Sequence, residues 1–348
     1  MAYNIDRNAR CAVVGHGSWA TALVKILLEN ERNVGWYIRN RDVLEHVRKH
    51  GTNPRYLRDV RFDPGSLHLS DSLDEVARDA EIVVLAAPSV YLKTTLEPLT
   101  EPLGDKFIVS AIKGIVPDDL ITVAEYVNRR YDVPFDQIGI VSGPCHAEEV
   151  ALERLSYLTV VCKTLENSRI LGDKIRTDYI NVGHSTDIYG IEYASVLKNI
   201  YAIAVGIAVG LGYGDNFLAV LISNGAMEMS RFMSQTYPSN RNTFASAYLG
   251  DLLVTSYSQF SRNRRFGLMI GKGYSVHSAQ MEMSMVAEGY YAAECIMKIN
   301  RQRGVDMPIA RMVYDVLYDG ASPSVSVRTA ARPSSSCSCV SCTPAKYP

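Results

Sequence analysis

The chain has 348 residues, of which 47% are hydrophobic and 21% are charged, the balance of a folded globular protein. Its length exceeds what one hydrophobic core usually organises, so we expect two domains. With 36 basic and 37 acidic residues the net charge is −1, which excludes a general attraction to nucleic acid or anionic lipid. An anionic substrate must therefore meet a local basic site.

The sequence predicts a cytoplasmic protein without stable membrane insertion. Its first residues, MAYNIDRNAR, lack the apolar segment of a secretory signal. The longest uncharged apolar run, residues 199–214, is shorter than the ~18 residues that a membrane span needs. Gly206 and Gly210 within it have the GxxxG spacing, which in water indicates close helix packing. The four cysteines before residue 323 are spaced like neither a disulfide framework nor a zinc site, which fits a reducing compartment.

The first recognisable unit is a buried strand, a glycine turn and a helix. An apolar run at residues 10–15 leads into the GxGxxA pattern that ends at Ala20, and an apolar helix pattern follows at 21–29. Gly15 permits the tight turn, and Gly17 lets the backbone approach a pyrophosphate at the helix N-terminus. Strand, turn and helix together predict a dinucleotide-binding fold.

The end of the second strand, residues 33–38, bears on the choice of cofactor. It carries Arg39 and Arg41 and no acidic residue. An acid there would bind the ribose hydroxyls and repel a 2′-phosphate, whereas arginine accepts the phosphate. The pattern favours NADPH, or use of both NADP and NAD; the alternative is that both arginines are simply solvated.

Further buried strands are predicted at residues 81–87, 106–111 and 137–142. In an open α/β sheet, ligands bind at the carboxyl ends of the strands. The residues that follow these ends should therefore line one crevice: Pro88, Ser89, Lys113, Gly143 and Cys145. Lys113 is a candidate for contacting an anion, although a surface lysine is the alternative. A thiol nucleophile built from Cys145 and His146 is disfavoured, because adjacent residues entering a helix point in different directions.

The second half of the chain changes to helical patterns, at residues 188–237, 244–258 and 284–303. We predict a Rossmann-like α/β domain over residues 1–187 and a helical domain over residues 188–322. A substrate would be held between the two domains.

Lys198 is the only charged residue between Tyr193 and Gly214. An ammonium group in such surroundings loses hydration and needs a partner or a lowered pKa, so it can transfer protons near neutral pH. The alternative is a lysine whose stem is buried while its head reaches water. Asp251 also lies in an apolar segment and needs a cationic or hydroxyl partner.

The segment SRNRRFG at residues 261–267 combines three arginines with serine and asparagine. Guanidinium groups bind phosphate through paired hydrogen bonds, so the segment suits a phosphorylated substrate. The alternatives are a solvated loop and a nucleic-acid patch, and the neutral charge balance disfavours the second.

Residues 323–348 are predicted to form a disordered or aberrant tail. From Ser322 onward the sequence has no acidic residue and no helical period. Cys337, Cys339 and Cys342 lack the fourth ligand of a structural zinc site, so we expect no metal. A slip of reading frame could produce such a segment.

Eight segments in order resemble the bacterial NAD(P)-dependent glycerol-3-phosphate dehydrogenase family. They are GHGSWATAL, NPRYL, AAPS, SAIKG, SGPCHAEEVA, VLKNIYAIAVGIAVGLGYGDN, YLGDLLVTSYSQFSRNRRFG and VAEGYYAAE. The resemblance runs from the glycine turn to about residue 323. It implies a Rossmann-like domain followed by a helical domain, usually as a homodimer.

The resemblance also implies roles for individual residues. Lys198 matches the catalytic lysine, and Asp251 would assist it. Expected cofactor contacts are Gly15, Gly17, Ser18, Trp19, Arg39, Lys113, Ala147, Arg262, Val286 and Glu288. Expected substrate contacts are Lys113, Gly143, Cys145, Lys198, Asn199, Asp251, Ser261, Arg262 and Asn263.

Two features depart from the family pattern. Cys145 stands where the family usually has serine, which replaces a hydroxyl contact with a weaker thiol one. The C-terminal helix also lacks its usual charged ending.

The resulting expectation is an enzyme that reversibly reduces dihydroxyacetone phosphate to sn-glycerol 3-phosphate for phospholipid synthesis. Lys198 would give a proton to the ketone oxygen, while Arg262 and Asn263 hold the phosphate. The nearest alternative is a relative of the 3-hydroxyacid and 6-phosphogluconate dehydrogenases, against which the SRNRRFG segment argues. A dinucleotide-binding sensor without turnover is disfavoured by the presence of both Lys198 and Asp251.

Overall fold

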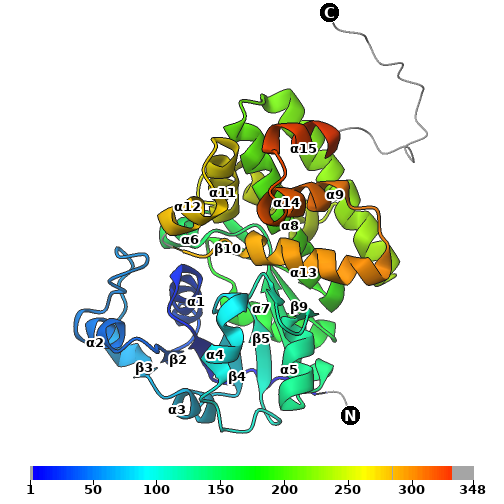
Figure 1. The fold of residues 1–348 in the computed structure, drawn as a ribbon. Helices are drawn as coiled ribbons and strands as arrows, with labels where there is room; N and C mark the ends of the chain where they lie inside the picture. The colour runs from blue at the N-terminus through cyan, green and yellow to red at the C-terminus, as the bar shows by residue number, and fades with distance from the viewer. Residues whose placement is uncertain (1–2, 284, 331–348) are drawn as a thin grey trace, which may run out of the picture.

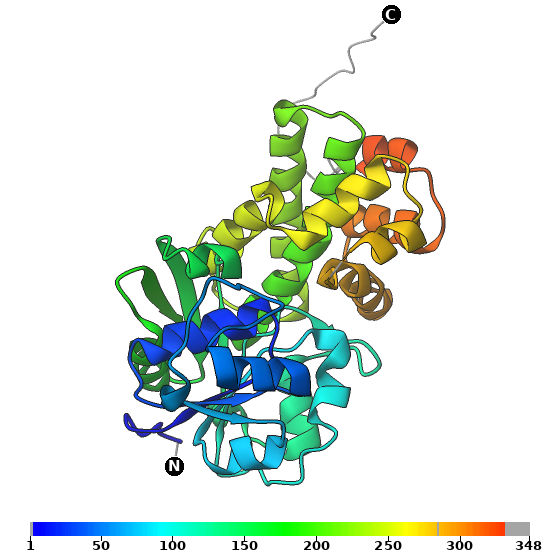
Figure 2. The same ribbon diagram turned by 90° about the vertical axis from the view of Figure 1, so that its left-hand side faces the viewer.

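The computed structural model describes residues 3–283 and 285–330. A sheet with flanking helices forms one part of the molecule, and most helices after residue 187 form the other, as two perpendicular views show (Figures 1 and 2). The predicted fold class, a Rossmann-like α/β domain followed by a helical domain, is confirmed.

The sheet has eight strands in the order β10-β9-β8-β5-β4-β1-β2-β3. All neighbouring pairs are parallel except β8 and β9, which are antiparallel. Their bounds are β1 Cys11–Val14, β2 Val34–Tyr37, β3 Leu67–Ser70, β4 Ile82–Leu85, β5 Phe107–Ser110, β8 Ile138–Ser142, β9 Ser156–Cys162 and β10 Ile180–Ser185. A separate hairpin pairs β6 (Ile115–Val116) with β7 (Ile121–Thr122). The chain direction places the ends of β1, β4, β5 and β8 at one edge, where ligands bind in such sheets.

Helices cover both faces of this sheet. Alternate residues of β1 enter different cores: Ala12 and Val14 belong to one, and Cys11 and Val13 to the other. The first domain's helices are α1 Ser18–Leu28, α2 Arg41–His50, α3 Leu73–Arg78, α4 Leu92–Leu96, α5 Val123–Tyr131, α6 Ala147–Ala151 and α7 Leu165–Ile175, with short 3₁₀ turns η1 Pro64–Ser66, η2 Ser89–Tyr91 and η3 Phe135–Gln137. Strands buried on both faces explain the continuous apolar runs in the sequence.

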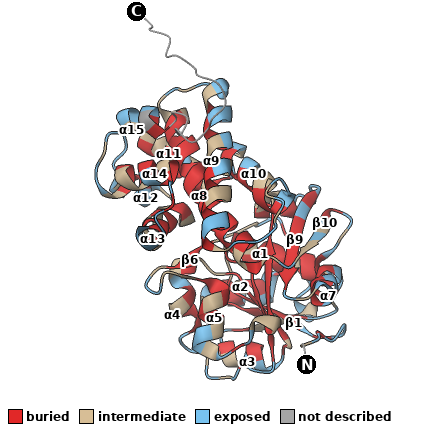
Figure 3. Cartoon of the chain, turned by 90° about the vertical axis from the view of Figure 1, so that its right-hand side faces the viewer, coloured by how far each residue is buried: buried red, intermediate tan, exposed pale blue. Residues whose placement is uncertain are grey.

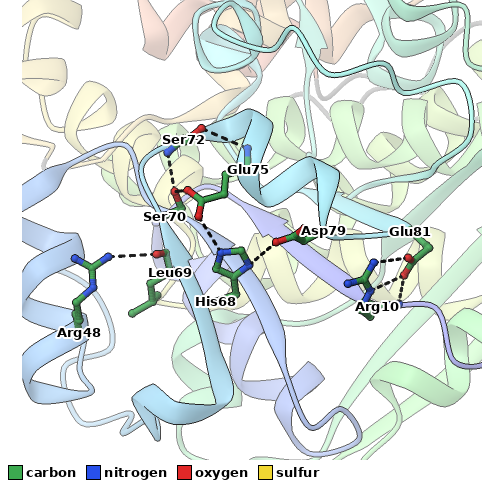
Figure 4. A network of polar contacts seen from close by, with 9 residues as sticks. All are labelled: Arg10, Arg48, His68, Leu69, Ser70, Ser72, Glu75, Asp79 and Glu81. Carbon is green, nitrogen blue, oxygen red and sulfur yellow. Dashed lines mark hydrogen bonds and ion pairs between the residues drawn. The ribbon is translucent and has the colours of Figure 1, made fainter.

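Polar contacts join β3 to the α3 region, and the residue before β1 to the residue before β4 (Figure 4). The ring of His68 on β3 lies between two carboxylates of the α3 region, 3.3 Å from Glu75 and 3.3 Å from Asp79. Arg10, just before β1, pairs with Glu81 at 2.7 Å. None of these residues lines the large cavity described below.

The helical part contains α8 Ile188–Gly210, α9 Asp215–Thr236, a π-helical turn η4 Ser246–Gly250, α10 Asp251–Tyr257, α11 Arg262–Gly271, α12 Val276–Glu282, α13 Glu288–Arg303, α14 Pro308–Tyr318 and α15 Pro323–Ala330. Helix α8 is long and apolar enough to cross a membrane, but 89% of its most apolar window is buried inside the protein. Figure 3 shows it buried along most of its length. It is a core helix around which the others pack.

Helices α8 and α11 cross in backbone contact. A Cβ added to Gly206 of α8 would lie 2.1 Å from the backbone oxygen of Arg264, and one added to Gly267 of α11 would lie 2.1 Å from that of Ile203. The GxxxG spacing therefore marks close helix packing, as predicted. The crossing brings the first turn of α11, which begins at Arg262, beside the middle of α8.

Two buried side chains of α8 form hydrogen bonds with the sheet domain. The hydroxyl of Ser195 on α8 forms a hydrogen bond with the hydroxyl of Ser142, the last residue of β8, with 2.7 Å between the two oxygen atoms. Glu192 accepts a 3.1 Å hydrogen bond from the backbone N–H of Ala124 in the first turn of α5. Burial raises the pKa of Glu192 to about 7.

The prediction of a disordered tail from residue 323 is wrong for residues 323–330. These residues form α15, and Val327 and Ala330 are buried. Their spacing of three residues places them on one helix face, and this short pattern is hidden by the serine-rich composition. The three tail cysteines, and the rest of that prediction, lie outside the described residues.

Replacing Gly206 with alanine should lower the free energy of unfolding by about 1–3 kcal/mol, the range for overpacking a core. The added methyl group has to push α11 away, since it meets a backbone oxygen rather than a flexible side chain. Urea unfolding measures the change. Gly104→Ala is the matched control, because a Cβ there meets no atom of the described chain within 4 Å. Equal stability of the two variants would contradict the close crossing.

Candidate active site

A cavity of about 810 Å³ lies between the two domains. Both the carboxyl ends of the sheet strands and the first turns of α11 and α13 contribute to its wall. It is lined by sixteen of the seventeen residues predicted to contact cofactor or substrate: Gly15, Gly17, Ser18, Trp19, Arg39, Lys113, Cys145, Ala147, Lys198, Asn199, Asp251, Ser261, Arg262, Asn263, Val286 and Glu288. Gly143, the seventeenth, does not line the cavity, but its carbonyl oxygen accepts a hydrogen bond from Lys113, which does. Of the other two residues expected in this crevice, Pro88 lines the cavity and Ser89 does not.

The glycine turn after β1 forms an anion-binding end of the cavity. Gly15 has φ +126°, and a Cβ there would lie 2.7 Å from the carbonyl oxygen of Ala86. Gly17 is the N-cap residue of α1, and no side chain caps this end of the helix. A Cβ added to Gly17 would meet no atom of the described chain within 4 Å. There is thus open space at the N-terminus of α1, where backbone N–H groups can bind a pyrophosphate.

An unpaired donor supports the same conclusion. Trp19, in the first turn of α1, has a buried Nε1–H without a hydrogen-bond partner in the described part of the chain. Buried donors are rarely left unpaired, so this N–H points to a ligand that supplies the acceptor. The open glycine turn and the Trp19 donor together fit a dinucleotide.

The two arginines after β2 have different positions. Arg39 is exposed and lines the cavity. Arg41 lies outside the cavity wall and pairs with Asp71, just after β3, at 2.7 Å. Of the two arginines, Arg39 alone lines the cavity.

Three charged side chains meet where the two domains join. Asp251, at the start of α10, is 1% exposed and accepts hydrogen bonds from Lys198 of α8 and Lys113 of the β5 loop. The Lys113–Asp251 distance is 3.3 Å. Lys113 also donates to the carbonyl oxygen of Gly143 at 2.9 Å. The lysine predicted from an apolar run thus has the acidic partner that its burial requires.

Burial and charge tune the protonation of this cluster. Burial, helped by the nearby Lys113, lowers the pKa of Lys198 to about 7, although Asp251 acts in the opposite direction. Burial acts to raise the pKa of Asp251, but the two lysines hold it below its usual value. Lys198 can therefore give or take a proton near neutral pH while Asp251 stays ionised.

A chain of amides holds the neighbouring helices in register. Asn199 donates to the carbonyl oxygen of Lys113 at 2.9 Å and accepts from the amide of Asn263 at 2.9 Å. The side-chain oxygen of Asn263 accepts from the backbone N–H of Gly289 at 2.9 Å. Both asparagines line the cavity, but most of their bonding capacity is used within the protein. One amide hydrogen of Asn263 remains for a ligand.

Only one of the three clustered arginines reaches the cavity. Arg262 lines it and lies 3.5 Å from the carbonyl oxygen of Val286, whereas Arg264 and Arg265 do not line it. Ser261 caps α11 by accepting from the backbone N–H of Arg264, so its hydroxyl hydrogen is left to donate elsewhere. The first turn of α11 thus presents one guanidinium and one hydroxyl.

A contact between the domains at the cavity edge was not predicted. Glu288, at the start of α13, accepts from the backbone N–H of Ser89 at 2.9 Å and from its hydroxyl at 2.5 Å. Burial raises the pKa of Glu288. Gly114 completes the contact, because a Cβ there would lie 2.3 Å from the Ser89 hydroxyl oxygen. The two partners are 199 residues apart, and no local pattern in the sequence relates them.

Cys145 and His146 both line the cavity. Burial raises the pKa of Cys145 to about 12 and lowers that of His146 to about 4. A thiol nucleophile needs the reverse, a thiolate beside a protonated imidazole. The structure thus agrees with the sequence in disfavouring such a pair. Sequence reasoning missed His146 as a cavity residue, together with Tyr56, Tyr91, Phe260, His277 and Gln280.

The open parallel sheet, the glycine turn and the buried lysine in a cavity between two domains define a two-domain NAD(P)-dependent oxidoreductase. The match to known families is more specific. Residues 10–168 match the profile of the NAD-dependent glycerol-3-phosphate dehydrogenase N-terminus, and residues 187–328 match that of its C-terminus. The chain belongs to the glycerol-3-phosphate dehydrogenase family.

Curated relatives and a solved structure agree with this placement. The chain is 34% identical over 325 residues to a glycerol-3-phosphate dehydrogenase (NAD(P)+) of an Exiguobacterium species, covering 92% of this chain and 94% of the relative. The enzyme of that name from Desulfotalea psychrophila is 36% identical over 323 residues, covering 91% and 95%. The crystal structure of glycerol-3-phosphate dehydrogenase from Coxiella burnetii superimposes with a TM-score of 0.85 at 28% identity, covering 93% and 99%.

Replacing Asp251 with asparagine should lower the pKa of Lys198 below its wild-type value. The carboxylate is the largest influence that favours the ammonium form, and the asparagine amide has no net charge. Competitive acylation of lysines across a pH series, read by mass spectrometry, measures this pKa. Asp173→Asn, at an exposed position on α7, should leave it unchanged. An unchanged or higher pKa in Asp251→Asn would contradict the coupling.

Proposed function

We propose that this protein catalyses the reversible NAD(P)H-dependent reduction of dihydroxyacetone phosphate to sn-glycerol 3-phosphate. The observation that carries the proposal is the buried Lys198–Asp251 pair in a cavity that also contains the dinucleotide turn. The relatives named above carry the name of this activity.

We propose that the first domain and the start of α13 hold the cofactor, which supplies or accepts the hydride when bound. The backbone at Gly15, Gly17 and Ser18 would bind the pyrophosphate. Further contacts would come from Trp19, Arg39, Lys113, Ala147, Arg262, Val286 and Glu288. Arg39 would pair with the 2′-phosphate of NADPH, and the lack of an acid after β2 leaves NADH acceptable as well.

Lys198 would be the acid and base of the reaction. As hydride reaches the ketone carbon, negative charge develops on the ketone oxygen, and the ammonium group donates its proton to that oxygen. In the oxidation direction the neutral amine accepts the hydroxyl proton. Asp251 would hold Lys198 in place and keep its pKa from falling further. Asn199 and Lys113 would fix the geometry around the pair.

The substrate phosphate would be bound by the first turn of α11. Arg262 offers a guanidinium, Ser261 a hydroxyl hydrogen and Asn263 one amide hydrogen, all at the cavity wall. Cys145 and the backbone at Gly143 would border the carbon chain of the substrate. Holding the phosphate in this way fixes the ketone relative to Lys198.

We also propose a division into domains at residue 187, a homodimer, a cytoplasmic location and a role in supplying phospholipid precursors, as the family resemblance implies. The near-neutral charge supports the absence of a nucleic-acid partner. The burial of α8 inside the protein supports the absence of stable membrane insertion. Sedimentation equilibrium tests the dimer.

Lys198→Ala should reduce turnover of dihydroxyacetone phosphate by roughly 10²–10⁴-fold, the usual contribution of a general acid. In the wild type, kcat/KM for reduction should fall as pH rises through about 7, because Lys198 loses its proton, and kcat/KM for oxidation should rise over the same interval. Oxidation of NADH and NADPH, followed by absorbance, measures both. Near-normal turnover by the alanine variant would refute the role of Lys198.

The same assay separates the alternatives. A wild-type protein that turns over dihydroxyacetone phosphate with neither cofactor, but reduces a keto acid, would belong with the hydroxyacid dehydrogenases in activity. Binding of a dinucleotide without turnover of either kind would indicate a sensor.

Arg39→Asp should raise the KM for NADPH far more than the KM for NADH, because the new carboxylate repels the 2′-phosphate. Arg41→Asp is the matched control: Arg41 follows the same strand but pairs with Asp71 away from the cavity. Its two KM values should change little. Equal increases for both cofactors in Arg39→Asp would remove the argument from Arg39.

A further inference from the structure

His146 is a cavity residue to which the mechanism above gives no role. His146 lies at the turn between β8 and α6, immediately before the first residue of α6. Its ring lines the cavity and packs against Phe260, with ring centroids 6.2 Å apart. Its Nε2 atom is buried and has no hydrogen-bond partner in the described part of the chain. A buried polar atom left in this way indicates that a bound molecule completes its hydrogen bonding.

The protonation of the ring determines what Nε2 can do. Burial, followed by the nearby Lys198 and Lys113, lowers the pKa of His146 to about 4. At neutral pH the ring is therefore uncharged, and one of its two nitrogens carries a lone pair. Nε2 is the buried nitrogen left without a partner at the cavity, so it is the atom that can offer this lone pair to a ligand.

The chemistry of the substrate leaves one group that matches this lone pair. The phosphate and the ketone oxygen have only acceptor atoms for this purpose, and both are better served by Arg262 and Lys198. A hydrogen-bond acceptor beside them needs a neutral donor. The free hydroxymethyl group of a three-carbon ketone phosphate is such a donor, and it is bonded directly to the ketone carbon that Lys198 serves.

Building on the proposed function, we propose that Nε2 of His146 accepts a hydrogen bond from the free hydroxymethyl group of dihydroxyacetone phosphate, and of glycerol 3-phosphate in the reverse direction. His146 is thereby a specificity-determining residue. It selects against a ketone phosphate in which a methyl group replaces the hydroxymethyl group, because Nε2 then stays buried and unpaired.

The test compares dihydroxyacetone phosphate with hydroxyacetone phosphate, in which that hydroxyl is missing. His146→Phe keeps the ring and its packing on Phe260 but removes the acceptor. It should lower kcat/KM for dihydroxyacetone phosphate about 10-fold and leave hydroxyacetone phosphate nearly unchanged, so that the ratio of the two falls about 10-fold. His146→Gln supplies a carbonyl acceptor and should recover part of the ratio. His50→Phe, at the exposed end of α2 and outside the cavity, should keep the wild-type ratio.

Each other outcome counts against the inference. An unchanged ratio in His146→Phe, or an equal loss for both substrates, would overturn it. A change confined to the KM for NADH would place His146 against the cofactor and overturn it too. A wild type that reduces neither compound would overturn the proposed function, and this inference with it.

Discussion

The active site depends on one buried carboxylate held between two lysines. Asp251 comes from α10, Lys198 from α8 and Lys113 from the loop after β5, so the cluster joins the helical part to the sheet domain. Lys198 could not be buried as an ammonium group without the carboxylate, because an unpaired buried charge is strongly destabilising. The same interaction that joins the domains also opposes the lowering of the Lys198 pKa by burial. Domain assembly and acid–base chemistry are therefore not separable in this protein.

Close backbone contact keeps that cluster beside the other parts of the site. The glycines of α8 and α11 allow the two helices to cross without side chains between them, and Arg262 and Lys198 then line the same cavity. The amide chain from Asn199 to Asn263 then ties the two helices and α13 together. A cavity built by side chains from elements so far apart in sequence needs such rigid supports, since small displacements reduce catalysis sharply.

Much of this arrangement follows from local sequence patterns. The glycine turn, the alternation of strands and helices, and the isolated Lys198 all carry short-range signals, and the structure contains all three. Strands β3 and β9 and the helix at residues 323–330 were not predicted. The contacts that sequence reasoning missed are non-local. Ser89 and Glu288 are 199 residues apart, and the ring of His146 packs against that of Phe260 in the other half of the chain. The pairing of Arg41 with Asp71 is also non-local, because Asp71 follows the neighbouring strand β3.

Chemical rescue of Lys198→Ala by small primary amines is the most direct test of Lys198 as the proton donor. The account predicts that methylammonium restores reduction of dihydroxyacetone phosphate in a saturable manner, with rates that follow the pKa of the amine across a series of similar size. A variant that folds, binds NADH and stays inactive with every amine of the series would contradict it.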